Sequence, residues 1–262
     1  WIGFVNGGAG GRPPSKPVPA GLHWDEWLGP APYRDYHDGL HPLYWRYWWD
    51  FGTGGLGDWG CHNLDGAFWA LKMSPPASVE CIKAVGGSDE QYPQGNHICW
   101  TVPVGAGKPP AKVHWYDGGQ APPLLDEFEK KYRRTFREGW NGGTFYIGTK
   151  GVMHTAPYGE SPRILPEEAH RAFPVPPQRI PRVKGSHFDH FLRCCKSGQP
   201  TCADFQYAAA ITEFLLVGHL AIKAGVGRPV HWDPAARQCT NLPELNRWLR
   251  CPCREGWNPG GL

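Results

Sequence analysis

The order of strand-like and helix-like segments is the feature that most limits how this chain can fold. Strand-like runs separated by short turns dominate the middle of the sequence, whereas helical patterns gather near residue 60 and after residue 186. Consecutive strands joined by short turns pair antiparallel, because parallel neighbours need a crossover of a dozen or more residues. The sequence therefore predicts an α+β fold, with an open, mainly antiparallel β-sheet and helices packed on one face.

The expected elements follow from hydrophobic period and turn residues. Strand patterns cover residues 77–87, 97–102, 112–117, 143–148, 151–155 and 229–232. Helical patterns cover residues 58–72, 124–139, 186–197, 203–224 and 243–249. Residues 23–57 are expected to form aromatic loops, and residues 162–185 an extended, proline-rich connection. The segment 203–224 is largely apolar, so we expect it to be buried.

Glycines and prolines crowd the first 22 residues, which is typical of a linker. The chain also starts at Trp1 rather than at a methionine, which indicates a fragment. The predicted organisation is a linker at residues 1–22, the end of a missing nucleotide-binding domain, followed by one domain over residues 23–262.

Charge and cysteine usage argue against several classes of partner. The net charge is only +3, and the short basic run at residues 130–134 is interpreted as a solvated helix face, so no nucleic-acid partner is expected. No run approaches the roughly 20 consecutive apolar residues of a membrane span. The nine cysteines include no C-x-x-C pair, and His187 and His190 lack an obvious third ligand, so no metal site is expected.

Residues 52–57 match the G-x-G-x-x-G pattern of dinucleotide-binding turns. The residues before them are charged and aromatic rather than the Val, Ile and Leu of a buried parallel strand. Asp58 also stands where a pyrophosphate would meet the helix N-terminus, and two anions there would repel. We therefore do not interpret this motif as a cofactor site.

The helix predicted at residues 58–72 carries the candidate chemistry. At 100° per residue, Asp58, His62, Asp65 and Trp69 share one narrow face, and apolar residues fill the opposite one. An Asp in the first turn, four residues before a His, can fix the imidazole tautomer, and that imidazole can take a proton from a substrate hydroxyl. The alternative is that Asp58 is an N-cap and His62 an exposed helix residue, and spacing alone favours this second interpretation.

The 14 tryptophans also allow two interpretations. Indole rings suit stacking on the C–H faces of sugars, but they fill protein cores equally well. Composition does not separate the two.

The stretch from Trp45 to Asp65 closely resembles the second motif of the Gfo/Idh/MocA oxidoreductases, which include glucose–fructose oxidoreductase and inositol dehydrogenase. Further segments resemble the C-terminal domain of the bacterial branch of that family, at residues 19–32, 147–151, 158–163, 186–189 and 204–208.

The resemblance implies an N-terminal Rossmann domain that binds NAD or NADP, followed by a substrate domain whose open sheet makes homo-oligomer contacts. The family's catalytic Asp and His map onto Asp58 and His62. Its catalytic Lys, in a Glu-Lys-Pro segment of the first domain, has no counterpart here, so this fragment alone should be inactive. Weaker inferences place Arg46 at the cofactor or substrate, and the following residues around the sugar: Trp48, Trp49, Tyr158 and His187. Packing remains an alternative for each.

Three functions remain open. The first is an NAD(P)-dependent oxidoreductase acting on a hydroxyl of a sugar, cyclitol or glycoside. The second is a redox-assisted glycosidase or lyase on the same fold. The third is a non-enzymatic carbohydrate-binding or oligomerisation module.

Overall fold

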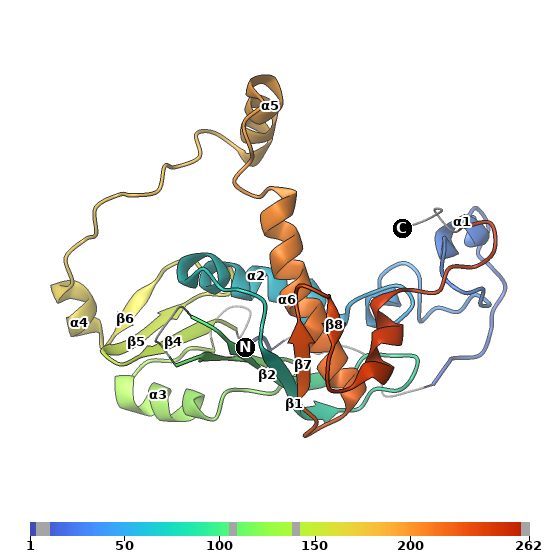
Figure 1. Cartoon of the computed structure of the whole chain (residues 1–262), viewed down its shortest axis with the longest axis horizontal. Helices are drawn as coiled ribbons and strands as arrows, with labels where there is room; N and C mark the ends of the chain where they lie inside the picture. Colours follow the sequence, from blue (N-terminus) through green and yellow to red (C-terminus); the bar gives the residue numbers. More distant parts are fainter. Residues whose placement is uncertain (4–10, 105–108, 138–141, 258–262) are drawn as a thin grey trace.

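The computed structural model describes residues 1–3, 11–104, 109–137 and 142–257 (Figure 1). Its main sheet has the strand order β3-β2-β1-β7-β8, and every neighbouring pair is antiparallel. The strands are β1 (Ser78–Val85), β2 (Gly95–Val102), β3 (Ala111–Tyr116), β7 (Val230–Asp233) and β8 (Gln238–Cys239). The predicted α+β class and antiparallel pairing are confirmed.

A second antiparallel sheet of three strands is distinct from the main sheet. It contains β4 (Thr144–Gly148), β5 (Gly151–Thr155) and β6 (Arg163–Leu165). A cluster of buried apolar side chains joins it to Tyr116 of β3 and to α3 (Leu124–Tyr132). The strands are therefore divided between two sheets, because the tight β4–β5 hairpin pairs with β6 rather than with the main sheet.

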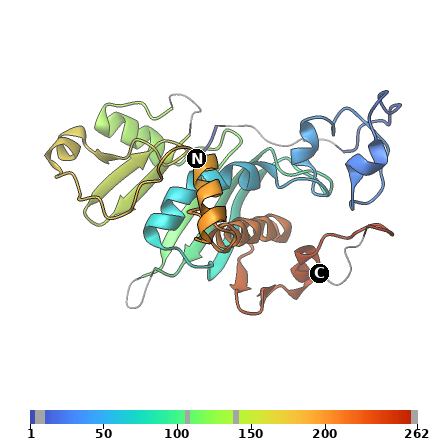
Figure 2. The same ribbon diagram turned by 90° about the horizontal axis from the view of Figure 1, so that it is seen from above.

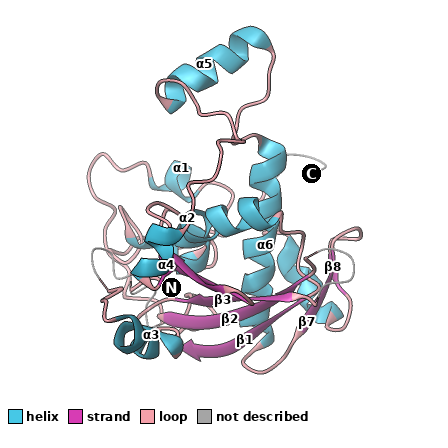
Figure 3. Ribbon diagram, turned by 90° about the vertical axis from the view of Figure 1, so that its left-hand side faces the viewer, coloured by secondary structure: helices cyan, strands magenta, loops and turns pink. Residues whose placement is uncertain are grey.

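The main core lies between the sheet and two long helices, α2 (Gly54–Leu71) and α6 (Phe205–Ala224). Figure 3 shows the two helices crossing beside the main sheet. Helix α6 packs on β1 and β2 as well as on α2. The indole of Trp100 on β2 stacks on Phe214 and donates a hydrogen bond to its carbonyl oxygen at 3.1 Å. Helix α6 is therefore fixed to the sheet, and α2 is fixed to α6.

Helix α6 is long and apolar enough to cross a membrane by length and composition alone. Buried helices of globular proteins meet the same criterion, and Phe214, Leu215 and Ala221 are buried in the main core. The predicted burial is confirmed for the inward face from Ile211 to Ala224, whereas Phe205 and Leu216 are exposed.

A third, aromatic cluster forms a lobe from residues 22–51, which contains α1 (Trp24–Leu28) and the 3-10 helix η1 (Tyr44–Tyr47). The buried guanidinium of Arg34 holds this lobe together by pairing with Asp50 at 2.6 Å and with Glu90 at 3.0 Å. Arg254, near the C-terminal end of the chain, donates to the carbonyl oxygen of Gly29, so the C-terminal segment lies beside the end of α1. Figure 2 shows this segment on the same side of the molecule as the lobe.

Several expected boundaries were wrong. Helix α2 begins four residues earlier than predicted, and α3 ends at Tyr132 rather than at residue 139. The segment predicted as an extended connection contains β6 and α4 (Glu167–Ala172), and residues 243–249 form the 3-10 helix η2 (Pro243–Leu249). Residues 11–22 contain neither helix nor strand, whereas residues 4–10 of the predicted linker lie outside the described residues.

Helix α5 (His187–Ser197) stands apart from both sheets, beyond the start of α6 (Figure 1). A long arm after α4 leads to it, and its N-terminus is closed by a capping box between Ser186 and Asp189. Its apolar side chains Phe188, Phe191 and Leu192 are exposed. The predicted helix is present, and its apolar face has no covering element within the described chain.

Gly218 and Gly66 offer a matched test of helix packing. A Cβ at Gly218 would lie 2.5 Å from Trp100 and 2.9 Å from Leu56, whereas one at Gly66 would meet nothing closer than 3.4 Å. Gly218→Ala should therefore destabilise the protein by about 1–3 kcal/mol, although alanine favours helices. Gly66→Ala should be neutral or stabilising. Urea unfolding of both variants checks this, and equal stabilities would contradict the packing described here.

Two buried imidazoles should make the fold acid-sensitive. Burial lowers the pKa of His154 and of His219 to about 4. The unfolded chain takes up these protons near the ordinary imidazole pKa of 6.5, so it binds more protons than the folded chain below that pH. Their stabilising contribution is full above pH 6.5 and is lost as the pH falls toward 4.

Between about pH 7.5 and about pH 5.5, each imidazole should remove about 1 kcal/mol from the free energy of unfolding. Denaturant titrations at the two pH values measure this loss. His154→Phe should make the pH dependence shallower, whereas His231→Ala, at an exposed position, should leave it unchanged. A His154→Phe profile that parallels the unsubstituted protein would refute the assignment.

Candidate functional site

The start of α2 is set by close backbone packing. A Cβ at Gly52 would lie 2.4 Å from the carbonyl oxygen of Arg46, and Gly54 has a φ of +56° with its α-carbon against the Tyr92 ring. These positions require glycine, and they begin the helix at Gly54. Asp58 therefore lies beyond the first turn, and the expectation that it sits at the positive end of the helix dipole was wrong.

The G-x-G-x-x-G segment has the wrong surroundings for a dinucleotide. It follows the 3-10 helix η1 and a turn rather than a strand, and all strand pairs in the described residues are antiparallel. The backbone at the three glycines of this motif already packs closely against Arg46, Tyr92 and Thr53, which leaves no space there for a phosphate. The described residues thus do not form a pyrophosphate cradle, in agreement with the sequence analysis.

His62 lies on the exposed face of α2, in contact with two aromatic rings. Its ring centroid is 5.1 Å from that of Tyr158, edge to face, and 6.0 Å from that of Trp59. The rings of Trp59 and Tyr158 are themselves 6.2 Å apart. Tyr158 comes from the turn after β5, so the second sheet contributes one side of this group.

The turn that carries Tyr158 lies beside the backbone of α2. A Cβ at Gly66 of α2 would lie 3.7 Å from the α-carbon of Gly159, and one at Gly159 would lie 3.8 Å from that of Gly66. The α2 backbone and the turn are therefore close neighbours one helical turn beyond His62. Sequence reasoning named Tyr158 and His62 separately, and the structure brings these two together.

Asp58 is paired with Arg46 rather than with His62. The Arg46 Nε and the Asp58 carboxylate are 4.0 Å apart, and both side chains are partly exposed. No hydrogen bond joins Asp58 to His62 in the described part of the chain. Arg46 also lies over the ring of Trp45, with 4.6 Å from its guanidinium carbon to the ring centroid. An exposed pair of this kind contributes little stability, so its carboxylate is free to exchange partners.

A second carboxylate lies one turn after His62. The hydroxyl of Tyr207, on α6, donates a hydrogen bond to Asp65. Burial, and then this bond to Asp65, raises the pKa of Tyr207, which therefore remains a neutral donor. The helical period had placed Asp65 on the face of His62, but nothing local in the sequence pointed to Tyr207 as its partner.

Trp48 belongs to the core. It is 1% exposed, and its indole N–H donates to the carbonyl oxygen of Gly39 at 2.6 Å. Its expected place in the sugar pocket is therefore wrong, because a fully covered ring offers no face to a ligand. Trp49 is half-buried, and its ring contacts Tyr92 and the ammonium of Lys223, each at 3.6 Å. Neither tryptophan belongs to the group around His62.

His187 also lies elsewhere. It begins α5, where its ring packs on Phe188 with 4.0 Å between centroids. The arm before α5 carries this helix away from α2, as Figures 1 and 3 show. The prediction that His187 lines the pocket of His62 is therefore wrong for the described chain. Among the described residues, no group of three or more His, Cys, Asp or Glu side chains could hold a metal ion.

Comparison with known families finds a match to the N-terminal third of the chain. Residues 4–90 match the family described as the oxidoreductase family, C-terminal alpha/beta domain. The matched residues are therefore similar to the C-terminal domain of the Gfo/Idh/MocA oxidoreductases, as the sequence resemblance implied. The matched range contains Arg46, Asp58 and His62 and ends before Tyr158. No curated protein matches the chain. The domain thus has a general oxidoreductase character, in a family that generally uses NAD(P).

The contrast between Trp48 and Tyr158 can be measured directly. Trp48→Ala should lower the free energy of unfolding by about 3–5 kcal/mol, because it empties a buried indole site. Tyr158→Ala should change it by less than about 1 kcal/mol, since Tyr158 is 51% exposed. Chemical denaturation of both variants gives the answer, and a stable Trp48→Ala protein would contradict the burial of this ring.

Proposed function

We propose that this chain forms the substrate domain of an NAD(P)-dependent oxidoreductase that acts on a hydroxyl group of a sugar, cyclitol or glycoside. The observation that carries the proposal is the exposed imidazole of His62 between the rings of Trp59 and Tyr158. A solvent-accessible base beside aromatic rings suits a ligand that has hydroxyl groups on its edge and C–H groups on its faces.

In this proposal His62 accepts the proton of the reacting hydroxyl. Asp58 orients His62 when substrate binding displaces the carboxylate from Arg46, because that pair is long and partly exposed. Arg46 is then available to hydrogen-bond the substrate. The Asp65–Tyr207 pair braces the next turn of α2 against α6, so that the helix keeps His62 in one orientation.

The hydride acceptor comes from outside the described residues. A nicotinamide nucleotide would accept the hydride from the carbon whose hydroxyl His62 deprotonates. Because the glycine segment of this chain does not fit a pyrophosphate, the nucleotide needs a separate binding domain. The exposed apolar side chains on α5 supply a surface on which such a domain could pack.

A homo-oligomer is proposed through the outer face of the main sheet. Ile82 and Val85 of β1 are exposed there. The neighbouring surface of β2 and β3 carries His97 and His114, whose ring nitrogens are 3.0 Å apart. Burial lowers the pKa of His97 to about 4, so this imidazole is uncharged at neutral pH, whereas Lys83 and Lys112 supply positive charge close to the two histidines.

The test of the catalytic assignment is His62→Ala in the complete enzyme, joined to its nucleotide-binding domain. Loss of the general base should lower kcat by about 10²- to 10⁴-fold with little change in substrate affinity. His187→Ala is the matched control, because this histidine is also exposed but lies on α5. Nicotinamide absorbance during turnover of a panel of sugars and cyclitols measures both variants.

The same assay separates the other functions. Net formation of reduced nicotinamide with an oxidised sugar supports the dehydrogenase, whereas cleavage of a glycoside without net nicotinamide reduction supports the redox-assisted glycosidase. Equal activity of His62→Ala and the unsubstituted enzyme would refute a catalytic role for His62. Sugar binding without any turnover would favour the non-enzymatic module.

A further inference from the structure

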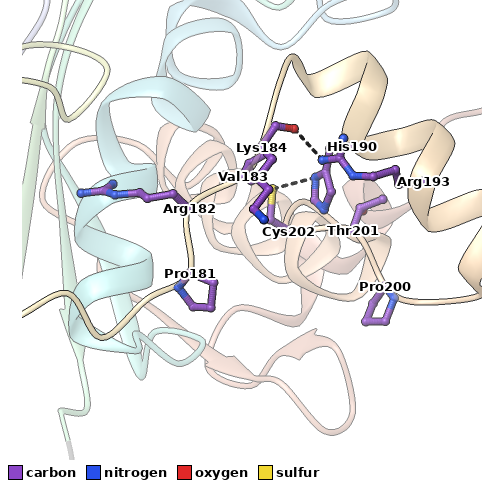
Figure 4. Close-up of a pocket in the computed structure, with 9 residues that line it drawn as sticks. All are labelled: Pro181, Arg182, Val183, Lys184, His190, Arg193, Pro200, Thr201 and Cys202. Atoms are coloured by element: carbon purple, nitrogen blue, oxygen red, sulfur yellow. Dashed lines mark hydrogen bonds between the residues drawn. The ribbon is translucent and has the colours of Figure 1, made fainter.

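A hollow of about 370 Å³ lies where the arm before α5 meets the chain that leaves that helix (Figure 4). Six of its lining residues are Lys184, His190, Arg193, Pro200, Thr201 and Cys202. It belongs to the part of the molecule that stands apart from the sheets, and none of these residues takes part in the group around His62.

A thiol and an imidazole meet in this hollow. The sulfur of Cys202 lies 3.6 Å from Nδ1 of His190, and Cys202 is exposed. Helix α5 ends at Gly198, whose φ of +69° reverses the chain. The thiol of Cys194 then donates to the carbonyl oxygen of Pro200, which holds the returning segment against the helix. The chain reversal at Gly198 and the Cys194–Pro200 hydrogen bond therefore hold Cys202 next to His190.

Positive charge borders the thiol. Arg193 donates to the carbonyl oxygen of Lys184 at 2.6 Å, which fastens the arm to α5 and brings both cationic residues to the hollow. In Figure 4, by contrast, the guanidinium of Arg182 points away from Cys202. The nearby carboxylate of Asp189 is engaged with Ser186 in the capping box. An exposed thiol next to an imidazole and cationic side chains has the surroundings of a reactive cysteine.

We propose that Cys202 is a thiol–disulfide exchange site for small anionic disulfides. The thiol proton moves to Nδ1 of His190, and the thiolate attacks one sulfur of the disulfide. A new S–S bond forms between Cys202 and that sulfur while the original S–S bond breaks. The other half leaves as a thiolate with the bonding electron pair. The disulfide is the oxidant, and Lys184 and Arg193 attract its carboxylates.

The experiment compares two probe disulfides on the whole chain at neutral pH. Dithiobis(nitrobenzoate) is dianionic, and dithiodipyridine is uncharged. Cleavage after Lys and Arg leaves Cys202 as the sole cysteine of the peptide 197–223, so mass spectrometry follows its labelling separately. Cys202 should react with the anionic probe at least about tenfold faster than Cys195, an exposed thiol on α5.

Substitutions at two positions distinguish the role of the His190 imidazole as proton acceptor from the role of the Lys184 charge in attracting the anionic probe. His190→Ala should slow the labelling of Cys202 by both probes, by about tenfold, whereas His187→Ala should leave it unchanged. Lys184→Gln keeps the backbone acceptor for Arg193 and should slow only the anionic probe, by about threefold. Lys184→Arg should restore the rate. Lys184 is exposed and His190 is half-buried. Circular dichroism verifies that the variants fold.

Three results would overturn the proposal. The first is labelling of Cys202 no faster than that of Cys195. The second is an equal labelling rate of Cys202 in His190→Ala and His187→Ala, which would show that the His190 imidazole does not activate the thiol. The third is an equal effect of Lys184→Gln on both probes, which would remove the preference for anions.

Discussion

The close packing of α2 on α6, and of α6 on the main sheet, is the constraint on which the candidate site depends. Gly60 of α2 meets Leu215, and Gly218 of α6 meets Trp100 and Leu56. Small residues at these points let the helices approach closely, and this fixes the rotation of α2 about its axis. Once that rotation is fixed, the apolar face of α2 is buried and His62 must face outward.

The opposite face of the site comes from a different sheet. The turn after β5 carries Tyr158, and Gly159 of that turn lies beside Gly66 of α2. The position of this turn depends on the aromatic cluster that joins the two sheets through Tyr116 and Leu165. The group around His62 therefore lies at the junction of two cores, where each contributes one rigid element. This arrangement positions side chains without requiring a long loop.

Hydrophobic period predicted the inner and outer faces of α2 because helical geometry is local. The start of the helix could not be predicted in the same way, because it depends on Tyr92, which is 38 residues from Gly54 in sequence. Trp48 and Trp49 are adjacent, yet one is buried and the other half-buried, and only the tertiary position of the lobe decides between them. The partners Arg46–Asp58 and Tyr207–Asp65 likewise arise from contacts between separate elements. Helical period placed Asp58 and His62 on one helix, and the structure has both on α2. The family resemblance grouped His187 with them, but His187 lies on α5, whose position depends on the long arm before it.

The central claim is that the exposed face of α2 beside Tyr158 binds a polyhydroxylated ligand. The most direct measurement is a nuclear magnetic resonance titration of the imidazole and tyrosine ring signals with D-glucose and with myo-inositol. The account predicts saturable shifts of the His62 and Tyr158 signals with at least one of these probes, while the His187 signal stays unchanged. Shifts confined to His187, or saturable binding that leaves His62 and Tyr158 unperturbed, would contradict it.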